Sequence, residues 1–228
     1  MTERKLRVLC LHGYHGTAAI LRSQMAGLVA AMPSNIGFVY VDAPSLARGD
    51  FGWWHEGFAG WERTLAWARD LLGAQPRFDG LFGFSQGAAL TGLLAAVNES
   101  ESARPSEDRW FDFAVMVGGF KSDTPRHAAL FRNALTLPSV HVMGRRDGIV
   151  PIDDSRELAR QFTDPLVIEH GGGHVVPALD AVTQPLARFL IERIGRNVPS
   201  PEHGGGISAA SPHVHDGVPK ESAGRGRD

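Results

Sequence analysis

The chain is poor in cysteine and in net charge, and it lacks long apolar runs. Its 228 residues include one cysteine, Cys10, so no disulfide can form within the chain and nothing indicates an oxidising compartment. No apolar run approaches the roughly 18 residues that a membrane-spanning helix needs. A formal net charge of -2 argues against nucleic acid or an anionic membrane as the main partner. The first apolar run begins at Leu6, which leaves no room for a signal peptide and predicts a cytoplasmic protein.

The chain does contain enough apolar sequence for one full core, because 43% of its residues are hydrophobic. Short apolar runs alternate with amphipathic stretches, which is typical of a parallel sheet covered by helices on both faces. The fold class predicted is therefore α/β, with a mostly parallel sheet of about six strands. We expect strands near 5–11, 36–41, 78–84, 112–118, 138–144 and 165–170, and helices near 18–32, 60–73, 86–97, 124–133, 152–161 and 177–194.

The composition changes after Arg196. Residues 197–228 contain glycine, proline, serine and charged residues but no aromatic residue. Such a stretch buries too little apolar surface to offset its ordering entropy, so we predict a folded domain over 1–196 and a disordered tail over 197–228. Three histidines and a Gly-Arg repeat in the tail are only weak signals for metal or RNA binding.

The pentapeptide Gly83-Phe84-Ser85-Gln86-Gly87 matches the G-x-S-x-G pattern of serine nucleophiles. The pattern alone also occurs by chance, but here it follows the apolar run 78–84 and opens a helical stretch, 88–97. A serine on such a strand-to-helix turn has a strained backbone, and glycines without a Cβ let the turn close. Its hydroxyl then projects above the carboxyl edge of the sheet. We predict that Ser85 is the nucleophile.

A serine hydroxyl needs a base within reach and a carboxylate that orients the base. Asp147 follows the predicted strand 138–144, which places it in a loop at the same edge of the sheet. Asp-Gly is also a strong turn signal, so Asp147 could be a turn residue alone. Asp153 and Asp154 are more typical of the first turn of the next helix. We predict that Asp147 is the acid.

The predicted base is His174, in a glycine-rich loop that follows the strand 165–170. His170 is the competing base, but it lies at the end of its strand, before the glycines. Two histidines four residues apart could also bind a metal, but only on a helix, which the three intervening glycines disfavour. We therefore expect no metal. The order Ser85, Asp147, His174 is that of the α/β-hydrolase arrangement.

Acyl transfer also needs donors for the developing oxyanion. One should be the backbone amide of Gln86, the residue after the nucleophile. The other should come from the loop after the first strand, where His12-Gly13 precedes Tyr14. The competing interpretation is that Gly13 and its neighbours only turn the chain before Thr17 caps a helix. We predict the backbone amides of Tyr14 and Gln86 as the oxyanion hole.

These segments together resemble the FSH family of fungal and animal serine hydrolases, within the α/β-hydrolase superfamily. The matching stretches span roughly residues 5 to 195: 9–14 with Arg22 and Gln24, 42–44, Trp53-Trp54, 83–88, 118–120, 141–144 through Asp147 to Pro151, and 170–177. The Gly-Phe-Ser-Gln-Gly block is also similar to the phospholipase/carboxylesterase and acyl-protein thioesterase group. The resemblance implies a cofactor-free esterase or thioesterase. Residues 17–20 and the cations Arg145 and Arg146 depart from the common family pattern and bear on specificity.

Substrate choice is expected to depend on residues 42–60, which combine aromatic residues with four glycines. A loop of this composition beside the catalytic edge is typical of an apolar wall or short lid for an acyl chain. The predicted substrate-binding residues are Phe51, Trp53, Trp54 and Phe58. The alternative is that the tryptophans only pack the following helix. No long cap insertion is evident elsewhere, so we expect a minimal cap and an open site.

The function predicted from these residues is a serine carboxylesterase that works through an acyl-enzyme intermediate. Its partner would be a small-molecule acyl ester or thioester. An alternative within enzymes is a thioesterase that releases an acyl or polyketide chain from a carrier-protein or coenzyme thiol. A non-enzyme alternative is a ligand-binding module that has kept the hydrolase fold.

Overall fold

The computed structural model describes residues 5–44, 52–74, 76–101 and 109–196. Six strands form one sheet in the order β2-β1-β3-β4-β5-β6, and every pairing is parallel. This confirms the predicted α/β class and the sheet of about six strands. The strands are β1 (Leu6–Leu11), β2 (Ile36–Val41), β3 (Gly80–Phe84), β4 (Phe113–Val117), β5 (Ser139–Gly144) and β6 (Leu166–His170). The predicted tail, 197–228, lies outside the described residues, so the domain boundary stays a prediction.

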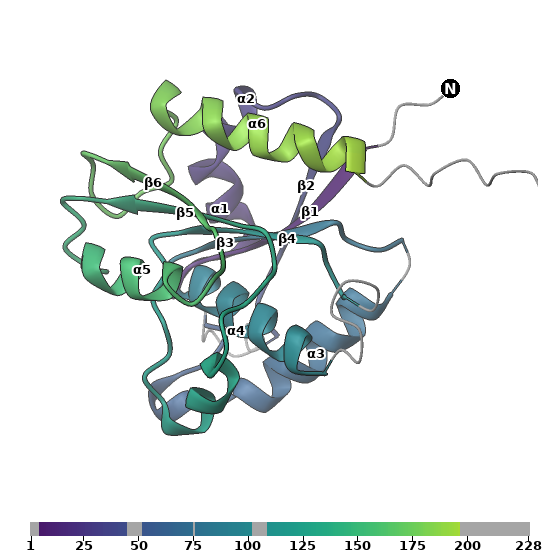
Figure 1. The fold of residues 1–228 in the computed structure, drawn as a ribbon, viewed down its shortest axis with the longest axis vertical. Helices are drawn as coiled ribbons and strands as arrows, with labels where there is room; N and C mark the ends of the chain where they lie inside the picture. Colours follow the sequence, from purple (N-terminus) through teal and green to yellow (C-terminus); the bar gives the residue numbers. More distant parts are fainter. Residues whose placement is uncertain (1–4, 45–51, 75, 102–108, 197–228) are drawn as a thin grey trace, which may run out of the picture. The chain divides into compact units, whose positions relative to one another are not determined.

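Helices cover both faces of the sheet (Figure 1). One face carries α1 (Ala18–Gln24), α2 (Ala26–Ala30) and α6 (Asp180–Arg196), and the other carries α3 (Trp61–Gly73), α4 (Gln86–Glu101) and α5 (Ile152–Ala159). Each face has its own apolar core. Residues alternate along β1, since Val8 and Cys10 enter the core under α1 while Leu9 and Leu11 enter the core under α4. Helix α4 is buried along most of its length, as its apolar, small-residue composition predicts.

Two predicted helices differ from the structure. The stretch 18–32 is two short helices, because the Met25 amide turns back to Leu21 and Ser23 at the end of α1. The stretch 124–133 is a 3-10 helix, η3 (Pro125–Phe131), in which the His127 amide donates to the Thr124 carbonyl three residues back. Neither difference moves a residue of the predicted site.

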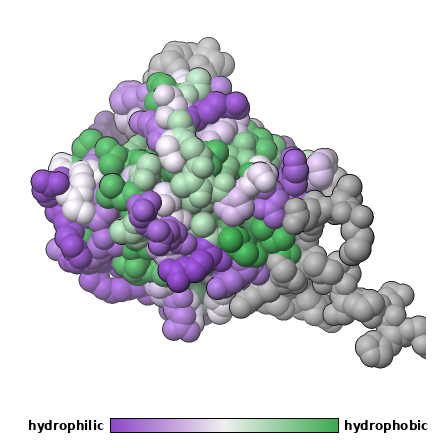
Figure 2. All heavy atoms as spheres, turned by 90° about the horizontal axis from the view of Figure 1, so that it is seen from above, coloured by the Kyte–Doolittle hydropathy of each residue, from purple (hydrophilic) through white to green (hydrophobic). Residues whose placement is uncertain are grey.

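The surface over α1, α2 and α6 mixes hydrophilic and hydrophobic side chains (Figure 2). Leu179 and Ile191 are among the exposed apolar side chains of the chain. Across the parts of the chain that the structure describes, no helix is both long and apolar enough to cross a membrane.

The order of the strands determines where a site can form. Strand β1 lies between β2 and β3, so the chain leaves β1 toward one side and later returns on its other side. In open parallel sheets, a crevice forms at such a switch point, outside the carboxyl ends of the strands. Leu11 pairs with Gly83, so the loops that follow β1 and β3 start side by side.

Strand β5 contains a buried histidine, His141, whose side chain is 2% exposed. Its Nε2 lies 3.2 Å from the Ser139 hydroxyl, and its ring centroid lies 5.0 Å from that of Phe162. Burial lowers the pKa of His141 from 6.5 to about 3, because the charged imidazolium would lose its hydration. The folded protein therefore holds this histidine neutral.

We predict that acid destabilises the fold through His141. Between pH 6.5, the ordinary pKa of histidine, and about pH 3, His141 is protonated in the unfolded state but neutral in the folded state. The free energy of unfolding should therefore fall by about 1.4 kcal/mol per pH unit from this group as the pH drops through that window. Urea unfolding of the wild type and of His141→Gln between pH 7.5 and 4.5 measures the difference in slope. Parallel curves for the two proteins would contradict the prediction.

Candidate active site

Ser85 lies on a sharp turn between β3 and α4 and has a positive φ of 56°. Flanking glycines are required here, since a Cβ at Gly83 would lie 2.2 Å from the Gly87 carbonyl oxygen, and a Cβ at Gly87 would lie 2.2 Å from the Leu11 carbonyl oxygen. The Ser85 amide donates to the Val117 carbonyl at 2.9 Å, which ties the turn to β4. A non-glycine residue at positive φ costs of order 1–3 kcal/mol and persists only where the surroundings enforce it. The turn holds Ser85 at the carboxyl edge of the sheet.

Asp147 and His174 are joined by a hydrogen bond of 2.7 Å between the Asp147 Oδ2 and the His174 Nδ1. Their loops follow β5 and β6, which pair at Gly144 and His170. The second carboxylate oxygen of Asp147 accepts the amides of Ile149 and Val150, both at 2.9 Å. Burial raises the pKa of Asp147, but the hydrogen bonds from His174 and from the two amides outweigh it, so the pKa lies below its ordinary value. The carboxylate is therefore held in its charged form.

Two of the competing residues, His170 and Asp153, make other contacts. His170 is buried, and its Nδ1 accepts the Gly172 amide at 3.1 Å. Asp153 pairs with Arg156 at 3.0 Å in the first turn of α5, as the sequence predicts. The two cations beside the acid are also engaged, because Arg145 donates to Glu169 and Arg146 donates to the Gly171 carbonyl. Burial lowers the pKa of His170, so a neutral imidazole is favoured there as well.

The His174 ring lies beside the nucleophile turn. Its centroid is 4.8 Å from that of Phe84, the residue before Ser85. The described residues include no hydrogen bond between the Ser85 hydroxyl and His174. Such bonds are often long in enzymes without substrate and tighten only when substrate binds. The structure thus brings the three predicted side chains to one edge, with the acid-base pair already formed.

The loop after β1 is also fixed. A Cβ on Gly13 would lie 3.1 Å from the Cβ of Ser85, so this loop passes directly over Ser85. The Gly13 carbonyl accepts two hydrogen bonds, from the His12 Nδ1 at 2.8 Å and from the Gly16 amide at 3.0 Å. Two donors on this carbonyl fix the plane of the peptide that joins Gly13 to Tyr14. The N–H of Tyr14 belongs to the same peptide and points in the direction opposite to the carbonyl. Among the described residues, neither the Tyr14 nor the Gln86 amide has a protein acceptor.

His12 acts in this loop as a neutral imidazole. Its Nε2 accepts the Ala43 amide at 3.1 Å, so the ring proton lies on Nδ1 and points to the Gly13 carbonyl. Burial lowers the pKa of His12 and outweighs the effect of the Gly13 hydrogen bond. No role was predicted for this side chain, although its position before Gly13 was a usable signal.

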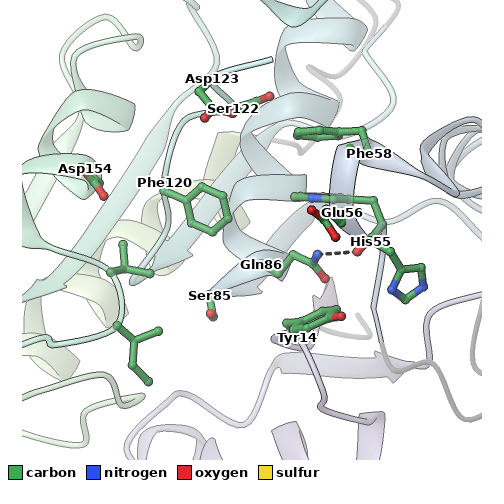
Figure 3. Close-up of a pocket in the computed structure, with 14 residues that line it drawn as sticks. Tyr14, His55, Glu56, Phe58, Ser85, Gln86, Phe120, Ser122, Asp123 and Asp154 are labelled. Carbon is green, nitrogen blue, oxygen red and sulfur yellow. Dashed lines mark hydrogen bonds between the residues drawn. The ribbon is translucent and has the colours of Figure 1, made fainter.

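A cavity of about 670 Å³ opens beside Ser85 (Figure 3). Its described lining includes the predicted Trp54 and Phe58, together with Tyr14, Gln86, Phe120, Ile149 and Val150, which also follow strands at this edge. The indole of Trp54 and the phenyl ring of Phe58 lie against each other, with ring centroids 5.0 Å apart. Phe120 belongs to the stretch 118–120 that resembles the family, but it was not predicted to contact substrate. Phe51 lies outside the described residues.

Trp53 does not line this cavity, so the prediction that it binds substrate is corrected. Its side chain is 0% exposed, and its ring packs against Trp67 of α3 at 5.4 Å, as the packing alternative proposed. The indole N–H donates to the His12 carbonyl at 2.7 Å. Of the two tryptophans, only Trp54 lines the cavity.

The side chain of Gln86 connects the turn at Ser85 to the aromatic wall of the cavity, the segment that contains Trp53 and Trp54. Its Oε1 accepts the Trp53 amide at 3.0 Å, and its Nε2 donates to the Trp54 carbonyl at 2.8 Å (Figure 3). The Thr64 hydroxyl donates to the Trp53 carbonyl from α3. All of these groups are buried, so their hydrogen bonds replace those that water would make.

We predict that Gln86→Leu lowers the free energy of unfolding by about 2–4 kcal/mol, because it leaves a buried amide and a buried carbonyl without partners. Urea unfolding measures the change. Gln24→Leu, at an exposed position of α1, is the matched control and should change stability by less than about 0.5 kcal/mol. If both variants lower the free energy of unfolding by less than about 0.5 kcal/mol, the Gln86 side chain does not hold the Trp53–Trp54 segment in place.

Fold and site together define an α/β hydrolase, with a strained serine turn after the third strand and a histidine-carboxylate pair in later loops at the same edge. The model of the family "Serine hydrolase (FSH1)" matches residues 1–186. The chain therefore belongs to this family of serine hydrolases and is an enzyme, as the sequence predicted. Within the described residues, no group of three or more histidine, cysteine, aspartate or glutamate side chains could hold a metal ion.

Curated relatives agree with this family, and solved structures agree with the fold. The chain is 31% identical to human esterase OVCA2 over 225 residues, which cover 82% of this chain and 96% of the human protein. It is 30% identical to the zebrafish esterase OVCA2, over 83% of this chain and 98% of that protein. In fold it is similar to Zea mays acyl-protein thioesterase 2, with a TM-score of 0.60 and 19% identity, over 84% of this chain and 95% of that one. A dienelactone hydrolase from Anabaena variabilis gives a TM-score of 0.60 at 18% identity, over 84% of this chain and 88% of that one.

Proposed function

We propose that the protein is a serine carboxylesterase that cleaves small-molecule acyl esters through Ser85, His174 and Asp147. The observation that carries the proposal is the 2.7 Å hydrogen bond between Asp147 and His174, made at the edge of the sheet where Ser85 is held in a strained turn. Family membership supports the class of reaction. A cytoplasmic location stays a prediction.

In the proposed mechanism, His174 takes the proton of the Ser85 hydroxyl through its Nε2 while the oxygen attacks the ester carbonyl. Asp147 holds the proton on the Nδ1 and stabilises the imidazolium that forms. The amides of Tyr14 and Gln86 donate to the oxyanion, and each such donor typically contributes about 10²- to 10³-fold in rate. His174 then protonates the leaving alcohol. Water, activated by the same base, releases the acid from the acyl-enzyme.

The acyl chain is proposed to occupy the cavity beside Ser85, against Trp54, Phe58 and Phe120. Its volume of about 670 Å³ falls in the range of pockets that accept small organic ligands. The Gly13–Tyr14 loop and the start of α4 meet at one end of this cavity, so a carbonyl attacked by Ser85 lies between the two proposed donors. The rest of the cavity is left for the substituent on the carbonyl.

Ser85→Ala should abolish hydrolysis of p-nitrophenyl butyrate and labelling by a fluorophosphonate probe, because both require the hydroxyl as nucleophile. Circular dichroism should show the same fold. Ser23→Ala, an exposed serine in α1, is the matched control and should retain full turnover. Turnover by Ser85→Ala at more than a few per cent of the wild-type rate would refute the assignment.

Asp147→Asn should lower kcat by about 10⁴-fold, as the equivalent change does in a serine protease, because the amide favours the wrong tautomer of the base. The matched control is Asp153→Asn, the nearby acid that pairs with Arg156, for which we expect less than a threefold change. Both are measured with the same ester at pH 8. A loss below tenfold for Asp147→Asn would move the acid elsewhere.

A thioesterase that acts on a carrier-protein or coenzyme thiol is the second candidate. The fold is shared with an acyl-protein thioesterase, and the same triad can expel a thiolate. Paired oxyester and thioester substrates with one acyl chain separate the two: a preference for the thioester above tenfold, after correction for uncatalysed hydrolysis, would favour this candidate. A binding module without catalysis would fail to react with the fluorophosphonate probe.

A further inference from the structure

The cavity beside Ser85 presents several aromatic faces. Tyr14, Trp54, Phe58 and Phe120 line it from three segments of the chain (Figure 3). Trp54 and Phe58 are nearly parallel, with an interplanar angle of 10°. The face of an aromatic ring carries negative partial charge and attracts a cation within about 6 Å of its centre, most strongly when water is excluded. Aromatic faces also suit an uncharged chain, so they do not decide the substrate alone.

Three carboxylates lie among these rings. Glu56, Asp123 and Asp154 line the same cavity, and Figure 3 shows them around Phe120 from three segments. Within the described residues, none of the three side chains has an ion pair or a hydrogen bond. Their charges are therefore not neutralised by a direct ion pair with the described residues.

Cations are lacking on this lining. No lysine or arginine is found among the described residues that line the cavity. Lys121 does not line this cavity: it pairs with Glu157 at 2.6 Å, in a neighbouring hollow that Asp123 and Asp154 also line. An anionic group on a substrate would meet three carboxylates and no partner, whereas a cationic group would meet both carboxylates and aromatic faces.

We propose that this cavity selects acyl esters whose acyl chain carries a positively charged amino or ammonium group. The inference rests on the proposed function, because the cavity is assigned to the acyl chain of an ester that Ser85 attacks. The first carbons of the chain lie along Phe120 and Trp54, and the cationic group lies between the aromatic wall and the carboxylates of Asp123 and Asp154. An anionic chain of the same length is rejected by the same carboxylates.

Three p-nitrophenyl esters with one leaving group test the proposal at pH 8, well above the ordinary pKa of a histidine. The 4-(trimethylammonio)butanoate carries the cation, the 5,5-dimethylhexanoate replaces its nitrogen by carbon in the same shape, and the glutarate monoester carries an anion. Each kcat/KM is divided by the uncatalysed hydrolysis rate of that ester in the same buffer. We expect the corrected value for the cation to exceed that for its neutral isostere by about tenfold, and the anion to fall below the neutral ester by a similar factor.

The cation preference should weaken in 1 M NaCl, where the Debye length falls to about 3 Å, because the carboxylates are exposed. The double variant Asp123→Asn, Asp154→Asn should bring the ratio of cationic to neutral ester down to about twofold. The matched control, Asp153→Asn, removes the same charge from the neighbouring position outside the cavity lining and should keep the ratio.

A wild-type ratio near one, or a ratio that the double variant leaves unchanged, would overturn the proposal. The failure of the proposed function is read separately. If the neutral ester is hydrolysed equally well by the wild type and by Ser85→Ala, the serine mechanism is wrong. If hydrolysis of the neutral ester needs Ser85 but the three esters react alike, only the charge selectivity is wrong.

Discussion

The close contact between the Gly83–Gly87 turn and the end of β1 is the constraint on which the site depends. A Cβ at Gly87 would lie 2.2 Å from the Leu11 carbonyl oxygen, so α4 can start where it does only because this residue is glycine. The contact brings the loop after β1 over Ser85 and close to the start of α4. Both proposed oxyanion donors therefore depend on the packing between the ends of two neighbouring parallel strands, β1 and β3.

Much of this arrangement could be predicted from the sequence, because it depends on local signals. Apolar runs indicate the strands, and parallel strands bring their following loops to one edge, which places Ser85, Asp147 and His174 together without knowledge of distances. The choice of Asp147 over Asp153 also follows local signals, since a residue in the first turn of a helix is typical of a cap or dipole partner.

The remainder depended on contacts between segments that are distant in sequence. Whether Trp53 or Trp54 faces the cavity is decided by the Gln86 carboxamide and the Thr64 hydroxyl, which hold the backbone between the two indoles. The two neighbouring tryptophans are both buried, and their sequence does not say which of them lines the cavity. In the same way, the stretch 124–133 has helical composition, but the structure forms a 3-10 helix there.

The double role of Gln86 has a consequence for how this enzyme could diversify. Its main chain is proposed to stabilise the reaction, while its carboxamide fixes the register of the aromatic wall. Catalytic power and the position of that wall are thereby coupled through one residue, and a substitution there would alter both. Substrate range can change through positions that line the cavity but do not hydrogen-bond to Gln86, such as Phe58 and Phe120. Substitutions there leave the reaction centre unchanged.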